Sequence, residues 1–361
     1  MGRVRVAYTL EQCWHRVPGG TAVAAIEVAR AMPDVRPDVQ LLGVSGRHGD
    51  DPAVDLDLSI DVAGLPGRGA LLYEAMLRLR QPRVERAWPG CGAVHCTTII
   101  PFATSRPMVT TVHDLAFLRH PEFFTRRGND VFRRSLAAVR RRAALVLCSS
   151  SATLADCAGA GIPSSRLRLV PLGVRPASVA DGGVEQARVR LGLPSEYLLF
   201  VGTVEPRKNL GRLVAALARR TDLPPLVVAG ARGWGEGQPD AGTGAAVQWL
   251  GHVDDGLLPA LYRGASAFVY PSLWEGFGLP VLEAMAQGTP VVTSAGVSTE
   301  EVAGGAAVLV DPTDEASILD GIDRALRDAA SLRGRGLARA AEMTWQRAAA
   351  LTAAAYDEVA G

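Results

Sequence analysis

The sequence lacks any long hydrophobic run. Its apolar stretches, such as residues 198–202 and 306–310, are far shorter than the roughly 18 to 20 residues that cross a bilayer, and its start lacks the apolar core of a signal peptide. The 361 residues, 48% hydrophobic and 21% charged, have the composition of a globular protein of two domains, which excludes a disordered or fibrous chain. We therefore expect a soluble cytoplasmic protein.

Cysteine is scarce as well. The five cysteines are an odd number without a C-x-x-C pair, mostly among apolar neighbours, which favours reduced core residues over a disulfide framework or a zinc site. They are Cys13, Cys91, Cys96, Cys148 and Cys157. The only D-x-D string, Asp55 to Asp57, lies in a polar segment away from the expected site, so we predict no metal.

Lysine is almost absent, because Lys208 is the only lysine among 38 basic residues. The net charge is only +1, yet residues 1–176 carry 23 basic and 15 acidic side chains and residues 177–361 carry 15 and 22. This asymmetry suggests that the first half meets an anionic partner, such as a membrane surface or a phosphorylated acceptor. The alternative is that two oppositely charged domains attract each other.

Short apolar stretches alternate with helix-like stretches along most of the chain. In the first half we expect strands at 4–8, 39–44, 93–96, 108–112, 144–148 and 167–170, and helices near 22–31, 71–79, 131–142 and 152–157. In the second half we expect strands at 197–201, 226–229, 247–250, 267–270, 290–293 and 307–310, and helices at 210–218, 257–263 and 279–287. This alternation is typical of parallel sheets covered on both faces.

The boundary between two such α/β domains is expected near residue 176, because residues 175–183 have no periodicity and read as a linker. We assign residues 1–176 to the first domain and 177–342 to the second. Residues 336–360 form an expected amphipathic helix with Leu337, Ala341, Trp345, Ala348 and Leu351 on one face. Its last part, 343–361, could return to the first domain, and a ligand is expected in loops after strands, in a cleft between the domains.

The richest segment lies between residues 266 and 294. After a strand that ends at Tyr270, two glycines permit close backbone approach and a proline suits the first turn of the next helix. The N–H groups of Phe277, Gly278 and Leu279 at that helix start could bind a diphosphate or sugar oxygen.

Two glutamates in this segment, Glu275 and Glu283, stand eight positions apart and could face one ligand from different heights. A carboxylate accepts two hydrogen bonds and therefore matches the vicinal diol of a ribose or another sugar. The alternative interpretation is a glycine-rich turn with two solvated glutamates.

A second motif, G-T-V-E-P-R-K-N-L, begins at Gly202, at the end of an expected strand. Arg207 and Lys208 would occupy the following loop, with Asn209 as a helix N-cap. A single lysine kept in an arginine-rich chain suggests that a compact ammonium is needed there. The two cations would neutralise a diphosphate leaving group, where charge develops when a sugar–phosphate bond breaks.

Two weaker signals lie in the first half. Gly19 and Gly20, in V-P-G-G-T-A, precede a helix and could direct their amides at a phosphate, although such a turn is more often only loop geometry. His113 follows the strand at 108–112 and would emerge at its carboxyl edge.

These segments, in this order, resemble the retaining glycosyltransferases of the GT-B fold in family 4, and the E-x7-E segment is highly specific. The resemblance implies two Rossmann-like domains facing across a cleft, with an acceptor on the first and a nucleotide-diphosphate-sugar donor on the second. It implies that Arg207 and Lys208 bind the diphosphate, with Gly20 near the phosphates. It further implies that Glu275 binds the donor sugar, Glu283 the ribose, and that His113 lies beside the reacting sugar.

The resemblance also implies a same-face displacement in which the leaving phosphate deprotonates the incoming hydroxyl, with no side-chain nucleophile and no required metal. The segment at 113–122 is similar to that of mannosyltransferases that use GDP-mannose, which favours mannose over a UDP-sugar. The acceptor would be a glycan, a lipid-linked acceptor or a natural product, as in polysaccharide biosynthesis. A UDP-sugar-dependent glucosyl- or N-acetylglucosaminyltransferase and a non-catalytic sugar-nucleotide-binding protein remain alternatives.

Other enzyme classes fit less well. A dinucleotide-dependent oxidoreductase should carry G-x-G-x-x-G after its first strand, which is missing here, and the glycines at 233–237 are mis-spaced. A sugar-nucleotide epimerase would consume the donor without an acceptor, and a glycogen-type synthase would use a long glucan primer. The Ala- and Arg-rich composition suggests a GC-rich bacterial genome, such as that of an actinomycete.

An arginine cluster on the expected helix at 131–142 and just before it prompts a further hypothesis, peripheral contact with anionic lipid at the inner face of the plasma membrane. Its members are Arg126, Arg127, Arg133, Arg134, Arg140, Arg141 and Arg142. A solvated helix face is the alternative. Nucleic acid is not an expected partner, because these arginines lack interleaved aromatic residues.

Overall fold

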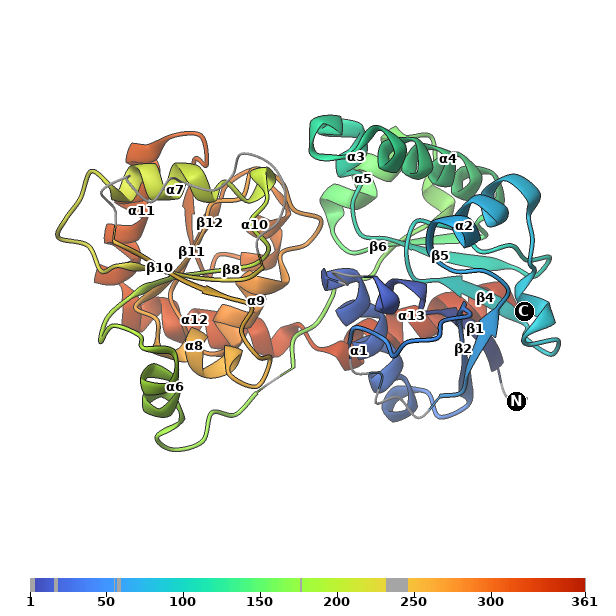
Figure 1. Cartoon of the computed structure of the whole chain (residues 1–361), viewed down its shortest axis with the longest axis horizontal. Helices are drawn as coiled ribbons and strands as arrows, with labels where there is room; N and C mark the ends of the chain where they lie inside the picture. Colours follow the sequence, from blue (N-terminus) through green and yellow to red (C-terminus); the bar gives the residue numbers. More distant parts are fainter. Residues whose placement is uncertain are drawn as a thin grey trace. The chain divides into compact units, whose positions relative to one another are not determined.

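The computed structural model describes residues 4–15, 19–54, 56, 60–175, 177–231 and 246–360. The chain divides into two compact units (Figure 1), of which unit 1 comprises Met1–Leu172 with Trp345–Gly361 and unit 2 comprises Gly173–Thr344. The D-x-D string, the glycines at 233–237 and the two residues before Gly19 lie outside the described residues.

Unit 1 is built on a parallel sheet of seven strands in the order β3-β2-β1-β4-β5-β6-β7. The strands are β1 (Val4–Thr9), β2 (Val39–Gly46), β3 (Val62–Leu65), β4 (Ala93–Cys96), β5 (Met108–Val112), β6 (Leu145–Cys148) and β7 (Leu167–Leu169). All residues of β4 and β6 are buried, as expected for apolar strands covered on both faces. The sequence analysis missed β3, a four-residue edge strand in which only Leu65 is buried.

Helices cover both faces of this sheet. They are α1 (Gly19–Val35), α2 (Gly69–Glu74), α3 (Ala116–Arg119), α4 (Arg126–Arg142), α5 (Ser151–Gly159) and α13 (Trp345–Ala360), and a π-helical turn, Ala75–Leu79, continues α2. Helix α4 begins five residues earlier than predicted, because the hydroxyl of Thr125 accepts the N–H of Gly128 and caps the helix. The Gly-Gly pair forms the first residues of α1 instead of preceding the helix.

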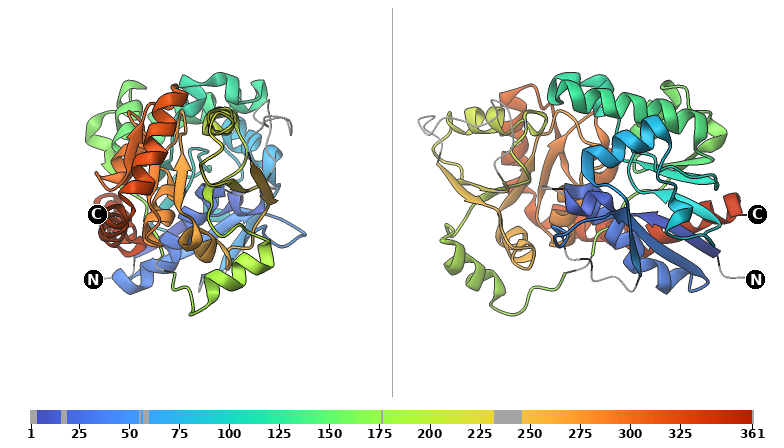
Figure 2. Two further views of the ribbon diagram at one scale, coloured as in Figure 1. Left: turned by 90° about the vertical axis from the view of Figure 1, so that its left-hand side faces the viewer. Right: turned by 45° about the vertical axis from the view of Figure 1, so that its right-hand side comes forward.

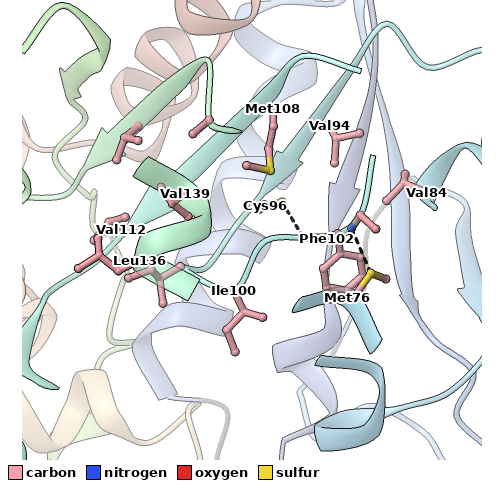
Figure 3. Packing of buried hydrophobic residues seen from close by; sticks show 14 of the residues in the cluster. Met76, Val84, Val94, Cys96, Ile100, Phe102, Met108, Val112, Leu136 and Val139 are labelled. Atoms are coloured by element: carbon pink, nitrogen blue, oxygen red, sulfur yellow. Dashed lines mark hydrogen bonds between the residues drawn. The ribbon is translucent and has the colours of Figure 1, made fainter. Parts of the chain in front are cut away.

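The core on the α2 and α4 face is continuous from the sheet into the helices (Figure 3). Sulfur atoms accept two backbone hydrogen bonds within it, from the N–H of Phe102 to Sγ of Cys96 at 3.2 Å and from the N–H of Ala103 to Sδ of Met76 at 3.0 Å. The loop after β4 is thereby held against the π-helical turn. All five cysteines are buried and free.

Unit 2 has a parallel sheet of six strands in the order β10-β9-β8-β11-β12-β13. The strands are β8 (Leu198–Val201), β9 (Leu226–Ala229), β10 (Val247–Gly251), β11 (Ala267–Tyr270), β12 (Val291–Ser294) and β13 (Val308–Val310). The helices are α6 (Gly183–Leu191), α7 (Leu210–Leu217), α8 (Leu258–Gly264), α9 (Leu279–Ala286), α10 (Ser298–Ala303), α11 (Glu315–Arg327) and α12 (Ala329–Glu342). Strands β8 and β11 pair in parallel, so the loops that follow them leave the sheet side by side.

The end of the chain differs from the single helix predicted for residues 336–360. The structure has two helices, α12 and α13, which are interrupted at Met343 and Thr344. Of the predicted apolar face, Trp345 and Ala348 are buried, whereas Leu337, Ala341 and Leu351 are exposed, so the prediction is confirmed only in part. The buried face of α13 runs through Trp345, Ala348, Ala349, Thr352, Ala353 and Tyr356 and packs against α1.

The buried imidazole of His95 connects α13 to the sheet, with Nδ1 2.7 Å from the hydroxyl of Tyr356 and Nε2 2.8 Å from Oγ1 of Thr111. Burial lowers the pKa of His95 to about 3. Between that value and the usual pKa near 6.5, the unfolded chain binds more protons, so stability falls as the pH falls. We expect this histidine to cost roughly 2 kcal/mol of unfolding free energy at pH 5.

Denaturant unfolding of the wild type and of His95→Gln at pH 7 and pH 5 measures this effect. Glutamine keeps donors and acceptors but does not titrate, so the variant should lose less stability on acidification than the wild type. Equal losses in the two proteins would contradict the assignment to His95.

Candidate active site

The carboxyl edge of the unit 2 sheet carries two neighbouring loops that hold most of the polar residues singled out in the sequence. One loop, 202–209, follows β8, and the other, 271–278, follows β11. The N–H of Leu273 donates to the carbonyl of Arg207 at 2.7 Å, so the backbones of the loops contact each other directly. Motifs about 70 residues apart in the chain thus form one site, at the point where the strand order reverses.

Arg207 lies between two carboxylates. Its NH1 donates to Oε2 of Glu275 at 2.6 Å, and its Nε donates to Oε2 of Glu205 at 2.8 Å. Both glutamate side chains are nearly buried, at 10% and 12% exposure, while that of Arg207 retains 25%. The guanidinium is therefore oriented from two sides with part of its surface still accessible.

Lys208 is buried, at 8% exposure, and its Nζ lies 5.9 Å from the ring centre of Tyr270. Gly202 makes room for it: with φ at +141°, a Cβ atom at this glycine would come within 2.3 Å of Nζ. Burial lowers the pKa of Lys208, and Glu275 opposes that shift. The ammonium has no hydrogen-bonded carboxylate within the part of the chain that the structure describes, so it is available to an anionic ligand.

Glu275 is held at both oxygens. Oε1 accepts the hydroxyls of Tyr270 at 2.8 Å and Ser272 at 3.2 Å, and Oε2 accepts Arg207. Burial by itself would raise the pKa of Glu275, but the cations of Arg207 and Lys208 bring it below the usual value. This glutamate is therefore an ionised hydrogen-bond acceptor at neutral pH.

Glu283, in α9, has a different environment. The hydroxyl of Tyr262 in α8 donates to its Oε2 at 2.8 Å. Burial raises the pKa of Glu283, against the effect of the tyrosine hydrogen bond. The two glutamates of the E-x7-E motif thus each receive one buried tyrosine hydroxyl, from Tyr262 and Tyr270.

These tyrosines and Glu205 are the residues that the sequence analysis missed as parts of the site. Tyr262 and Tyr270 have the pattern of core residues, at 2% and 1% exposure, and both pack on Phe268 with ring centres 5.5 Å apart. Nothing in the local sequence indicates that their hydroxyls point at carboxylates. Glu205 stood inside the quoted motif, and its position two residues before Arg207 was the available signal.

The start of α9 lies in the same loop. Gly278 has φ at +108° and precedes Leu279 and Pro280, the first helical residues. The N–H groups of Phe277, Gly278 and Leu279 have no hydrogen-bond acceptor among the described residues. Free amides at a helix start attract anions.

Three of the predicted residues belong to unit 1. Gly19 and Gly20 are exposed at the start of α1. His113 follows β5, is half-buried, and has Nε2 3.3 Å from the carbonyl oxygen of Thr97. Burial lowers its pKa, so the imidazole is neutral at neutral pH. Its own carbonyl accepts the hydroxyls of Ser149 and Thr153, which hold this turn in place.

The unit 2 site combines two cations, two acceptor carboxylates and free amides at a helix start. Cations and amides suit a diphosphate, and the carboxylates suit hydroxyl pairs. Within the described ranges, no group of three or more His, Cys, Asp or Glu side chains is arranged to hold a metal ion. No helix of those ranges is long and apolar enough to span a membrane.

Comparison with known structures identifies the fold. Sucrose-phosphate synthase from Thermosynechococcus elongatus superimposes with a TM-score of 0.75 over 99% of both chains at 20% sequence identity. The Anabaena protein HepE in complex with UDP-glucose gives a TM-score of 0.75 over 98% of this chain and 99% of that one, at 19% identity. The chain has the GT-B fold of glycosyltransferases.

Sequence comparison identifies the family. The family model "Glycosyltransferase Family 4" matches residues 18–178, and "Glycosyl transferases group 1" matches residues 185–341. The O-antigen chain mannosyltransferase B of Escherichia coli is 34% identical over 265 residues, 69% of each chain. A D-inositol 3-phosphate glycosyltransferase of Frankia alni is 36% identical over 203 residues, half of each chain. The chain belongs to this family of glycosyltransferases, which use nucleotide sugars.

Proposed function

We propose that this protein transfers a mannosyl group from GDP-mannose to an acceptor hydroxyl of a glycan, glycolipid or natural product, with retention of the anomeric configuration. The observation that carries the proposal is the meeting of Arg207, Lys208 and Glu275 on adjacent loops of unit 2. The choice of mannose as the transferred sugar is supported by the 34% identity to the O-antigen chain mannosyltransferase B over 69% of both chains.

In this proposal Arg207 and Lys208 bind the diphosphate, together with the free amides at the start of α9. Glu275 accepts hydroxyls of the donor sugar and Glu283 those of the ribose. In unit 1, the proposal assigns the phosphates to Gly19 and Gly20. It assigns the reacting sugar to the neutral imidazole of His113. Unit 1 binds the acceptor.

The chemistry follows from charge. The bond between the anomeric carbon and the leaving phosphate oxygen breaks while the acceptor oxygen approaches on the same face, and the acceptor proton passes to that phosphate oxygen. Lys208 and Arg207 stabilise the negative charge that develops on the diphosphate, and positioning by Glu275 reduces the entropy cost of the encounter. No side-chain nucleophile and no metal ion are assigned.

Thermal denaturation with GDP or UDP in the presence of EDTA tests the donor. A ligand at 100 times its dissociation constant stabilises the folded protein by roughly 2.7 kcal/mol, which raises the melting temperature measurably. We expect a rise with GDP that is much smaller in Lys208→Ala. A rise with UDP only would keep the transferase and overturn the GDP donor, and no rise with either nucleotide would overturn the donor site.

The lowered pKa of Lys208 gives this site a pH dependence. The protonated ammonium binds the diphosphate, so GDP affinity should be constant below the pKa of Lys208 and fall as the pH rises through it. The fall should begin at a lower pH than for an ordinary lysine.

Titration calorimetry of GDP across alkaline pH measures this dependence. Lys208→Met is the control, since any alkaline loss that it retains belongs to the nucleotide or to other groups. Identical pH profiles in the two proteins would contradict the role of Lys208.

A further inference from the structure

Two large leucines of unit 1 lie almost fully in solvent. Leu71 is 77% exposed and Leu79 is 73% exposed, the first in α2 and the second at the end of the π-helical turn. Leu79 stands between Arg78 and Arg80. Exposure of such side chains costs free energy that association with an apolar medium would recover.

This helical segment lies beside α4, as Figure 1 and the right-hand view of Figure 2 show. Arg134 of α4 makes two parallel hydrogen bonds to the carboxylate of Glu74, at 3.0 and 2.6 Å. Arg78 also pairs with Glu74, and Arg127 lies near enough to lower the pKa of that glutamate further. Arg134 also pairs with Asp130, so three arginines face two carboxylates, which leaves an excess of positive charge.

Positive charge is less compensated at the other end of the segment. Burial lowers the pKa of Arg142, and the nearby charges of Arg80 and Arg141 lower it further. None of the three has a carboxylate partner within the described ranges. The structure therefore adds Arg80 and two leucines to the arginine cluster that the sequence placed on α4 alone.

A similar tripeptide elsewhere shows that this arrangement is not a general feature of the surface. In α6 of unit 2, Val189 is 68% exposed between Arg188 and Arg190. There Arg188 makes two hydrogen bonds to Glu185, and Arg190 pairs with Asp254 at 3.4 Å. In unit 2, therefore, the two arginines that flank the exposed apolar residue are both neutralised by carboxylates.

We propose that the patch formed by Leu71, Leu79, Arg78, Arg80, Arg127 and Arg141, named here the α2–α4 patch, binds the surface of a bilayer that contains anionic lipid. The arginines would contact the lipid phosphates while the leucines enter the interface, as in amphipathic surface segments. A soluble polyanion would satisfy the arginines but leave the leucines in water, so the combination favours a membrane. The proposal does not depend on the donor or on the reaction.

Co-sedimentation of the full chain with vesicles tests the patch. We expect binding to phosphatidylcholine vesicles that contain phosphatidylglycerol, weak binding to phosphatidylcholine alone, and a loss of binding at high salt. Arg80→Asn and Arg141→Gln should each weaken binding about five-fold. Asparagine is chosen because Arg80 has φ at +53°, which asparagine tolerates. Leu79→Ser should weaken binding about ten-fold.

The matched control is Val189→Ser, which removes an equally exposed side chain between two arginines and should leave binding unchanged. The changed side chains are exposed, and a melting curve for each variant shows that it is folded. Absence of binding to anionic vesicles, or equal binding by Leu79→Ser and the wild type, would overturn the proposal. Equal affinity for heparin or for nucleic acid, independent of Leu79, would assign the patch to a soluble polyanion instead.

Discussion

Replacement of Glu275 by glutamine should lower kcat/KM for sugar transfer by about 10² to 10³-fold, the size expected when a preorganised polar contact to the reacting group is lost. Glutamine has nearly the shape of glutamate, but its amide nitrogen cannot accept the hydrogen bonds of Tyr270, Ser272 or Arg207. Arg207 would keep only Glu205 as an ionic partner, so its orientation would change as well. Steady-state kinetics with the purified variant measure this loss.

Tyr270→Phe is the graded control for that experiment. It removes one hydrogen bond to the same carboxylate and leaves the charge and the Arg207 contact in place, so about a ten-fold loss or less is expected. The parallel substitution Tyr262→Phe acts on Glu283 and should change KM for the donor more than kcat. If Glu275→Gln retained wild-type kcat/KM, Glu275 would have only a structural role.

Gly202→Ala should abolish nucleotide binding and also lower stability. The backbone at φ +141° is unfavourable for alanine, at a cost on the order of 1–3 kcal/mol. The added Cβ would lie 2.3 Å from Nζ of Lys208 and 3.3 Å from its Cε, so the ammonium must leave its position. Displacement of this cation from the proposed diphosphate site should eliminate the GDP-induced rise in melting temperature.

Gly211→Ala is the matched control, nine positions further along the chain. A Cβ atom at Gly211 meets nothing within 4 Å, and the residue lies in helix α7, where alanine is favoured over glycine by roughly 0.5–1 kcal/mol. This variant should be as stable as the wild type or more so, with unchanged GDP binding. Retention of GDP binding in Gly202→Ala would show that Lys208 does not need its position over the glycine.

The fold class and the candidate donor site could be predicted because both depend on local patterns. Apolar runs separated by helical periodicity indicate parallel α/β units, and the motifs that begin at Gly202 and end at Glu283 place polar residues directly after strands. The end of the chain was harder to predict. An Ala-rich segment is apolar in several directions, so the pattern grouped Leu337 and Leu351 with Ala348. The structure instead buries Ala353 and Tyr356 beside Ala348.

The sequence by itself determined the two α/β sheets, the two loops and the residue types of the candidate site, since these properties are set within a few residues of each motif. Only the tertiary structure decided that Arg207 joins Glu275 across 68 positions, and that Arg80 lies near Arg142. Those contacts arise where strands far apart in the chain become neighbours and where helices pack on one another. Their electrostatic energy depends on burial and distance, which no local pattern contains.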